Sequence, residues 1–442
     1  MNRWHFLLAA SILIASCNTQ HDYDAVFKNP QLYCNTVHDL NTVVMGNNFT
    51  PIVASRNYLY AAIAAYEVIA AGYPQRYNSL AGQLKELDSV PKPPAGQKID
   101  FELGALLAYC KLGEAVTFPK GSMKETTDML EALAKEHGMP RDVYDNTLAY
   151  ADNVGAAIMQ WSRGDHYLQT RRSPKYTVKD SPGRWVPTPP GYFQAAEPHW
   201  NEIRFVTVDS VNEFMPHPPY AFDMTDKQSP YYQEVIKIKN TGDSLSSEQA
   251  FIADFWDDNP FKLNVFGHVM YATKKFSPGG HWMSITGIAA IKSGADFPKT
   301  VAAYAETSIA LFDAFIQCWN VKYTYNTMRP ETVIDKYIDP NWRPHLQTPP
   351  FPEYTCGHCT ISAAAAEALT KEFGDHFAFT DTTELEFGIN ARSFPSFRDA
   401  ALETMHSRFY GGIHYNYCCE LSNTMGRQIG TLISEKVKTK KD

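Results

Sequence analysis

The sequence predicts an all-α protein made of two helical bundles joined by a long proline-rich segment. Apolar residues recur at helical spacing along most of the 442-residue chain, and strand signals are few. Residues 171–230 are rich in proline with interleaved aromatic residues, which is typical of a long segment that connects domains or packs over a surface. We expect the N-terminal bundle at 35–170 and the C-terminal bundle at 231–437.

The individual helices follow from their start signals and their periodicity. Thr50-Pro51 is a helix cap followed by proline at the first helical position, and it opens an alanine-rich segment that continues to about Ala71. The expected helices are 51–71, 98–117, 123–137, 141–163, 246–257, 280–293, 297–320, 358–373, 396–409 and 415–435. Pro330 is interpreted as a helix stop signal.

The first residues predict export. A short basic stretch precedes an apolar run from Phe6 to Ala15, which is too short to span a bilayer. Ile14-Ala15-Ser16-Cys17 resembles a bacterial lipoprotein box, so residues 1–17 are expected to form a signal peptide that ends at a lipidated Cys17. The protein is then anchored on the periplasmic or cell-surface side of a bacterial membrane, and ordinary secretion is the alternative.

Composition is that of a globular protein, with 44% hydrophobic and 20% charged residues and a net charge of −8. This charge argues against a nucleic-acid partner. No later stretch reaches 18 consecutive apolar residues, so the lipid anchor is the expected contact with a membrane. Eight cysteines leave seven after Cys17, an odd number, so at least one is not paired within the chain.

Three short segments near the C-terminus point to the binding of a tetrahedral oxyanion such as phosphate or vanadate. They are Lys322 to Pro330, Thr355 to His358 and Ser407 to His414. Arginine offers a planar fork of donors to two oxygens, and lysine adds a compact charge. Gly357 permits a close approach of the backbone at the start of an alanine-rich helix, whose N-terminus attracts an anion. His358 and His414 remain for bonding to the central atom and for moving protons.

Each segment taken singly has a plainer explanation. Arg329-Pro330 is typical of a helix end, His414 of a buried histidine, and Ser407-Arg408 of a solvated helix face. Their combination favours a site, because a local cationic cluster stands out in a chain whose net charge repels anions.

Lys-x6-Arg-Pro, Gly-His before a helix and Ser-Arg-x5-His together resemble the signature of the vanadium-dependent haloperoxidases. Type 2 phosphatidic acid phosphatases and bacterial acid phosphatases share it. Further segments resemble bacterial haloperoxidases, and iodoperoxidases of marine bacteria above all: 276–282, 313–322 and 348–354. The similarity covers about residues 40–435 and implies the same all-α architecture.

The resemblance implies a role for each site residue. His414 binds vanadium through a ring nitrogen, and His358 takes a proton from hydrogen peroxide. The equatorial oxygens of vanadate are held by Lys322, Arg329, Arg408 and the Gly357 amide. Trp319 and Phe351 match positions that line the halide site. The implied reaction is oxidation of a halide, iodide first and bromide second, by hydrogen peroxide to hypohalous acid, with the metal acting as a Lewis acid.

The second segment departs from the family pattern. Relatives carry Pro-Ser-Gly-His, whereas this chain has Thr355-Cys356-Gly357-His358. A thiol is a weaker donor to an oxyanion than a hydroxyl, and it is exposed to stepwise oxidation by peroxide and hypohalite. Cys356 is nonetheless assigned to the cofactor site. Cys418 is a second difference, at a position where many relatives carry an acidic residue.

Cys356 to Cys359 also form a C-x-x-C motif, which in exported proteins is associated with redox or disulfide chemistry. The proline-rich upstream sequence and the helical flanks argue against a thioredoxin-like fold, although a structural disulfide stays open. Two further functions are compatible with the three segments. One is a phosphomonoesterase in which His414 attacks phosphorus and His358 protonates the leaving group. The other is a lipid-anchored protein that binds anions without turnover.

Overall fold

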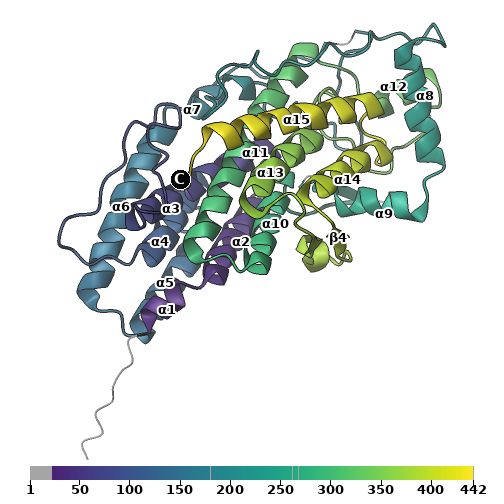
Figure 1. Ribbon diagram of the computed structural model, residues 1–442. Coiled ribbons are helices and arrows are strands. Elements are labelled where there is room, and N and C mark those ends of the chain that lie inside the picture. The colour runs from purple at the N-terminus through teal and green to yellow at the C-terminus, as the bar shows by residue number, and fades with distance from the viewer. Residues whose placement is uncertain (1–21, 180, 261, 267, 442) are drawn as a thin grey trace, which may run out of the picture.

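The computed structural model describes residues 22–179, 181–260, 262–266 and 268–441 (Figure 1). The expected signal peptide and Cys17 lie outside these residues. Within the described part of the chain, no helix has both the length and the apolar character needed to cross a bilayer. The fold is all-α, as the sequence predicts, with two short antiparallel hairpins as its sheets.

The N-terminal half is built from helices whose caps are read directly from sequence. Thr50 Oγ1 accepts the Val53 N–H at 3.3 Å, and Pro51 occupies the first turn of α3, as expected. The helices of this half are α1 (Tyr23–Phe27), α2 (Pro30–Gly46), α3 (Pro51–Gly72), α4 (Phe101–Val116), α5 (Lys124–Glu136), α6 (Arg141–Ser162) and α7 (Tyr167–Thr170). Helix α2 was not predicted, although Asn29-Pro30 caps it in the same way as Thr50-Pro51 caps α3.

The proline-rich segment contains one short 3-10 helix, η1 (Trp200–Glu202), and packs over the helices. Trp185 and Trp200 are fully buried. The backbone N–H groups of residues 206–208 all donate to the carboxylate of Asp313, at 2.8–3.0 Å. The buried carboxylate therefore accepts hydrogen bonds from backbone N–H groups that have no partner in a helix or sheet. This explains how an irregular segment can be buried.

The C-terminal half contains the longest helix and the elements that build the site. Its helices are α8 (Pro230–Asp243), α9 (Ser247–Phe255), α10 (Pro278–Ser293), α11 (Phe297–Tyr325), α12 (Pro330–Tyr337), α13 (Gly357–Phe373), α14 (Phe397–Tyr410) and α15 (Asn416–Lys436), with η2 (Thr383–Phe387). Its hairpins pair β1 (Lys262–Phe266) with β2 (Val269–Thr273), and β3 (Phe379–Asp381) with β4 (Arg392–Phe394).

The interpretation of Pro330 as a stop signal is wrong. Helix α11 ends at Asn326, which adopts the left-handed conformation with φ of 51°, and Pro330 begins α12 at its first helical position. Proline is well suited to that position, because the N–H it lacks has no acceptor there. The sequence therefore missed α12, as it missed α8.

The two halves share one continuous core. Helix α3 packs against α4 and α11, and α13 packs against α11, α14 and α15. Figure 1 shows α11 and α13 near the middle of the molecule, with the N-terminal helices on one side and α8, α9 and α14 on the other. The C-terminal residues return to the N-terminal half, where the Asn78 N–H donates to the Thr439 carbonyl at 2.8 Å. The boundaries of the two expected bundles stay a prediction.

Candidate active site

Lys322 enters the site from the last turn of α11. Asp296 caps this 29-residue helix, and Lys322 is fully buried near its other end. Its Nζ donates to the carbonyls of Pro352 (2.8 Å) and Glu353 (3.1 Å), which leaves one of its three N–H bonds for another acceptor. Burial lowers the pKa of Lys322 to about 8.

Arg329 is the residue before α12, so its side chain leaves the helix start and points into the core. Its Nε donates to the Phe351 carbonyl at 2.9 Å and Nη1 to the Ile413 carbonyl at 2.8 Å. Burial lowers the pKa of Arg329 to about 10, a value at which it stays charged near neutral pH. Its Nη2 is buried, and no residue of the described chain accepts its hydrogen bond.

Arg408 and His414 are brought together by the turn between α14 and α15. Gly412 has a φ of 77°, and a Cβ there would come within 3.0 Å of Pro344, so glycine is required on both counts. The Ile413 N–H closes the turn on the Arg408 carbonyl at 3.3 Å. Arg408 donates from Nη1 to the Trp256 carbonyl at 2.8 Å, and its Nε has no partner among the described residues.

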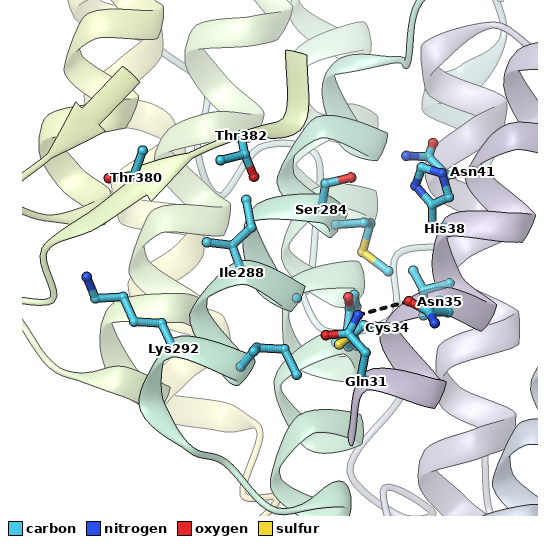
Figure 2. Close-up of a pocket in the computed structure, with 15 residues that line it drawn as sticks. Gln31, Cys34, Asn35, His38, Asn41, Ser284, Ile288, Lys292, Thr380 and Thr382 are labelled. Atoms are coloured by element: carbon cyan, nitrogen blue, oxygen red, sulfur yellow. Dashed lines mark hydrogen bonds between the residues drawn. The ribbon is translucent and has the colours of Figure 1, made fainter. Parts of the chain in front are cut away.

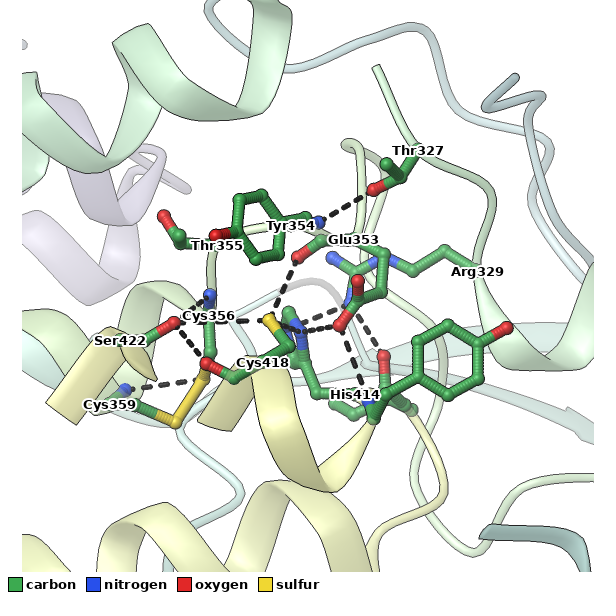
Figure 3. A network of polar contacts seen from close by, with 12 residues as sticks. Thr327, Arg329, Glu353, Tyr354, Thr355, Cys356, Cys359, His414, Cys418 and Ser422 are labelled. Atoms are coloured by element: carbon green, nitrogen blue, oxygen red, sulfur yellow. Dashed lines mark hydrogen bonds and ion pairs between the residues drawn. A yellow bond between two sulfur atoms is a disulfide. The ribbon is translucent and has the colours of Figure 1, made fainter. Parts of the chain in front are cut away.

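The tautomer of His414 follows from its two partners (Figure 3). Arg329 Nη1 can only donate, so His414 Nε2, 2.9 Å away, is the acceptor and carries a lone pair. Nδ1 then carries the proton and donates to Glu353 Oε1 at 3.0 Å. Burial and the neighbouring charges of Arg329 and Lys322 hold the pKa of His414 well below its usual value. A neutral imidazole with Nδ1 anchored is the state in which histidine binds metals.

Glu353 was not predicted as a site residue. It is fully buried, and burial raises its pKa to about 6. It also accepts the Tyr415 N–H at 3.2 Å, which ties the segment before α13 to the start of α15. The sequence signal that could have identified Glu353 is the presence of an acidic residue inside an apolar, proline-rich stretch. Cys418, where relatives carry an acid, lies 3.8 Å from His414 Nδ1, and Glu353 supplies the carboxylate from another element.

Gly357 and His358 form the first turn of α13, as expected. The first N–H groups of a helix have no intrahelical acceptor, so the Gly357 amide is free to donate. Burial, followed by the charges of Arg408 and His281, holds the pKa of His358 well below its usual value. His358 Nε2 is buried and has no hydrogen-bond partner among the described residues.

A buried charge cluster behind His358 also escaped the sequence analysis. Asp258 Oδ2 lies 3.9 Å from His358 Nε2, and Asp258 Oδ1 lies 2.9 Å from His281 Nδ1. The other ring nitrogen of His281 is 2.8 Å from Asp381 Oδ2. Burial lowers the pKa of His281, but the two carboxylates raise it by more, so His281 is an imidazolium held between them. These residues are separated widely in sequence, and only the packing of α10 against the β3 hairpin unites them.

Trp319 and Phe351, the expected halide-site residues, lie side by side next to two of the cations. Their ring centroids are 4.9 Å apart. Lys322 Nζ lies 4.9 Å from the centre of the Phe351 ring, and Arg329 Cζ lies 5.1 Å from it. Trp319 Nε1 donates to the carbonyl of Ala196 at 3.1 Å, so the proline-rich segment holds the indole in place.

Cys356 is joined to Cys359 in a disulfide (Figure 3). Its sulfur also accepts the Cys359 N–H at 3.2 Å and thereby caps α13. A disulfide sulfur has no S–H bond, so in this form Cys356 cannot donate to an oxyanion through its side chain. The sequence analysis considered a free thiol here and left a disulfide open. The other described cysteines are buried and unpaired: Cys34, Cys110, Cys318, Cys418 and Cys419.

A network of polar contacts links the disulfide to His414 (Figure 3). The Cys356 N–H donates to Ser422 Oγ at 2.8 Å, and Ser422 Oγ lies 3.8 Å from Cys418 Sγ. Cys418 Sγ in turn lies 3.8 Å from His414 Nδ1. Cys356, which caps α13, and His414, the expected metal ligand, therefore both contact polar side chains of α15.

The residues present fit a bound oxyanion. Within the described residues, Arg329 Nη2, Arg408 Nε and His358 Nε2 are buried without a hydrogen-bond partner. An unsatisfied buried polar group costs about 1–3 kcal/mol, so such convergence indicates a ligand. A Cβ placed at Gly357 would make ordinary van der Waals contact with Trp319, at 3.5 Å. A cavity of about 450 Å³ between α2 and α10 is lined by none of these residues (Figure 2).

Comparisons with known proteins agree with this geometry. Residues 302–441 match the model of the VCPO second helical-bundle domain. The crystal structure of the first bacterial vanadium-dependent iodoperoxidase superposes with a TM-score of 0.88 at 42% identity, over 93% of this chain and 98% of that one. A comparison with curated proteins gives no match.

Two more distant structures show the fold alone. The holo form of a bacterial vanadium-dependent chloroperoxidase has a TM-score of 0.65 at 15% identity, covering 88% of this chain and 93% of that one. Its apo form has a TM-score of 0.65 at 17% identity, over 88% and 94% of the two chains.

The fold and the site define an all-α protein with a buried cluster of cationic side chains and, beside it, a neutral histidine whose Nε2 carries a lone pair. The chain belongs to the vanadium-dependent haloperoxidase family. It is therefore a haloperoxidase whose cofactor is vanadate, and the expectation drawn from the three segments is confirmed at the level of family, enzyme class and cofactor.

Proposed function

We propose that iodide is the principal halide this enzyme oxidises with hydrogen peroxide, and that bromide is a poorer substrate. The observation that carries the proposal is the 42% identity to a bacterial iodoperoxidase over almost the whole of both chains. The chloroperoxidases share the fold at far lower identity and do not bear on the halide.

The site residues divide into those that hold vanadate and one that moves a proton. Lys322, Arg329 and Arg408 offer charged donors to its oxygens, and each keeps a donor that no protein acceptor takes up: the third N–H of Lys322, Arg329 Nη2 and Arg408 Nε. The Gly357 amide adds a donor at the N-terminus of α13. When bound, vanadate supplies a Lewis acid that activates peroxide toward halide.

The two histidines differ in their surroundings, and this supports different roles for them. His414 presents an unprotonated Nε2 while Glu353 holds Nδ1–H, so it is suited to ligate vanadium. His358 presents an unpartnered Nε2 on a helix start and is neutral, so it is suited to take the proton that hydrogen peroxide releases on binding. Cys356 contributes to the cofactor site as the cap of the turn that carries Gly357 and His358.

The halide is expected beside Trp319 and Phe351. Both rings border the cations proposed to hold the oxyanion, so an anion next to them is attracted by Lys322 and Arg329. Iodide is large and polarisable, which suits an aromatic surface.

A comparison of halides tests the specificity. Initial rates with iodide, bromide and chloride, each at fixed peroxide and saturating vanadate, give kcat/KM for the three anions. We expect iodide to exceed bromide, and chloride to show no turnover. A kcat/KM for bromide or chloride equal to that for iodide contradicts the proposal.

The protein is proposed to be exported and lipid-anchored through Cys17, on the outer side of a bacterial membrane. The support is the sequence Ile14-Ala15-Ser16-Cys17 after a short apolar run. Cys17→Ala should move the protein from the membrane fraction to the soluble fraction and remove the lipid mass from its N-terminal peptide. The matched control is Ser16→Ala, which leaves the acceptor thiol in place. Soluble protein in both wild type and Cys17→Ala points to ordinary secretion.

A further inference from the structure

The Cys356–Cys359 disulfide encloses two of the residues assigned to the reaction. The two Cα atoms are 5.4 Å apart, and Gly357 and His358 are the residues between them. The proposed oxyanion amide and the proposed base therefore lie inside a four-residue ring that the sulfurs close.

The surroundings exclude large oxidants from the folded protein. Cys356 and Cys359 are both 0% exposed. A protein disulfide donor must bring its own sulfur into line with one of these, which burial prevents. A third thiol lies in the same cluster: Cys419 Sγ is within 4.8 Å of both sulfurs. A pair that is reduced in the folded enzyme can thus be closed again only by a small oxidant.

We propose that the Cys356–Cys359 bond is a site of self-modification, closed by the hypohalous acid that the enzyme itself produces, before that acid leaves the site. The inference rests on the proposed function, which supplies the oxidant one residue away from Cys356, beside Gly357. It assigns to these cysteines a substrate role that halide oxidation alone does not require.

The chemistry balances without another reagent. The Cys356 thiolate attacks the halogen of hypohalous acid, so an S–X bond forms, the O–X bond breaks, and hydroxide leaves. The Cys359 thiolate then attacks the Cys356 sulfur and displaces halide. In sum, two thiols and one hypohalous acid give one disulfide, one halide ion, one proton and one water. The two electrons pass from the sulfurs to the halogen.

Closure of the disulfide protects Cys356 from further oxidation. A lone thiol beside peroxide and hypohalite proceeds to sulfinic and sulfonic acids, which are not reversed by thiols. A neighbouring thiol that reacts with the first oxidation product forms a disulfide, which thiols can reduce again. Cys419 is placed to do the same for Cys356 when Cys359 is absent.

The test uses the full-length, vanadate-loaded enzyme, reduced with a dithiol and freed of it. Free thiols are then alkylated at intervals and located by peptide mass spectrometry. The first sample receives peroxide alone, the second peroxide with iodide, and the third, without vanadate, aqueous iodine as a source of hypoiodous acid. We expect Cys356 and Cys359 to lose both thiols in the second and third samples about tenfold faster than in the first. A trap for free hypohalous acid in the second sample should not slow the loss.

Each contrary outcome has a distinct meaning. Closure by peroxide alone at the rate seen with iodide overturns the inference, as does closure that the trap abolishes. The disulfide could close with aqueous iodine in the third sample while the second sample shows neither closure nor iodide oxidation. That result contradicts the proposed function, and the enzyme then produces no oxidant for the cysteines. Normal iodide oxidation with both thiols intact overturns only the inference.

Variants give a second readout that does not depend on rates. Cys359→Ala should form a Cys356–Cys419 disulfide during turnover, whereas Cys359→Ala/Cys419→Ala should accumulate sulfinic acid at Cys356. Cys110→Ala is the matched control, a buried thiol in α4, and should retain the Cys356–Cys359 bond. An unmodified Cys356 in the double variant after turnover, with iodide oxidised normally, contradicts the proposal.

Discussion

The carboxylate of Glu353 lies 3.0 Å from Nδ1 of His414, and both groups are buried. This contact fixes the proton on Nδ1 and leaves the lone pair on Nε2, where Arg329 Nη1 donates to it, so the tautomer of the proposed ligand is set before vanadate arrives. Glu353 also accepts the Tyr415 N–H, which gives the carboxylate a fixed orientation.

Replacing Glu353 by glutamine should weaken vanadate binding about 10- to 100-fold, the usual effect of losing the partner of a metal-bound histidine. The amide can still accept a hydrogen bond, but it no longer balances the charge of the site. Calorimetric titration of the apo-protein with orthovanadate measures the effect. Glu306→Gln, another buried carboxylate, is the control and should bind vanadate normally. Equal affinities in the two variants would show that Glu353 acts only in folding.

The two histidines should separate binding from turnover. His414→Ala is expected to abolish vanadate binding at micromolar concentrations, because the ligand atom is lost. His358→Ala should still bind vanadate but oxidise iodide about 10²–10⁴-fold more slowly, the usual contribution of a positioned base. Affinity and turnover are measured on both, with the exposed His406→Ala as control. The reverse pattern would mean that the roles are exchanged.

Replacing Trp319 should affect the KM for iodide more than the affinity for vanadate. Trp319→Phe removes the hydrogen bond to the Ala196 carbonyl and shifts the ring beside Phe351. We expect KM for iodide to rise about tenfold, with vanadate affinity unchanged. Trp282→Phe, which also loses a buried indole hydrogen bond, is the matched control and should leave KM unaltered. An unchanged KM in Trp319→Phe would place the halide elsewhere.

The imidazolium of His281 gives a stability that depends on pH. Its pKa is raised in the folded protein, so its contribution is complete below the unfolded value near 6.5 and is lost as pH rises through the folded pKa. His281→Gln should cost about 3–5 kcal/mol at pH 6, because it leaves Asp258 and Asp381 buried without a cation. The difference in unfolding free energy between His281→Gln and wild type, measured by urea unfolding, should decrease at higher pH.

The exposed pair His199–Glu202 provides the control for this effect. His199→Gln should change stability by less than about 1 kcal/mol, as solvated pairs do. If the gap between His281→Gln and wild type grows with pH, His281 is not charged in the folded protein.

The sequence predicted most of the helices and the site residues because both are encoded locally. Thr50 and Pro51 identify the start of α3, and Lys322 and Arg329 recur at a recognisable spacing. Pro330 was misread because proline marks helix starts as well as stops, and only the left-handed Asn326 shows which applies. Helix α2 was missed although its cap has the same form.

The unpredicted parts of the site depend on packing between distant segments. Glu353 and His414 are 61 residues apart in the sequence but in contact in the fold. Asp258, in a loop before the first hairpin, lies beside His281 and His358. Neither carboxylate belongs to a motif with a fixed spacing. The disulfide was left open because spacing alone does not distinguish a free C-x-x-C pair from a bonded one.

The most direct test of the account is iodide oxidation by protein stripped of metal, with and without added orthovanadate, at fixed peroxide. We predict no turnover without vanadate, saturable activation with it, and loss of activation when phosphate competes for Lys322, Arg329 and Arg408. No activation by vanadate, together with hydrolysis of a phosphomonoester by the same preparation, would contradict the account and assign the site to phosphoryl transfer.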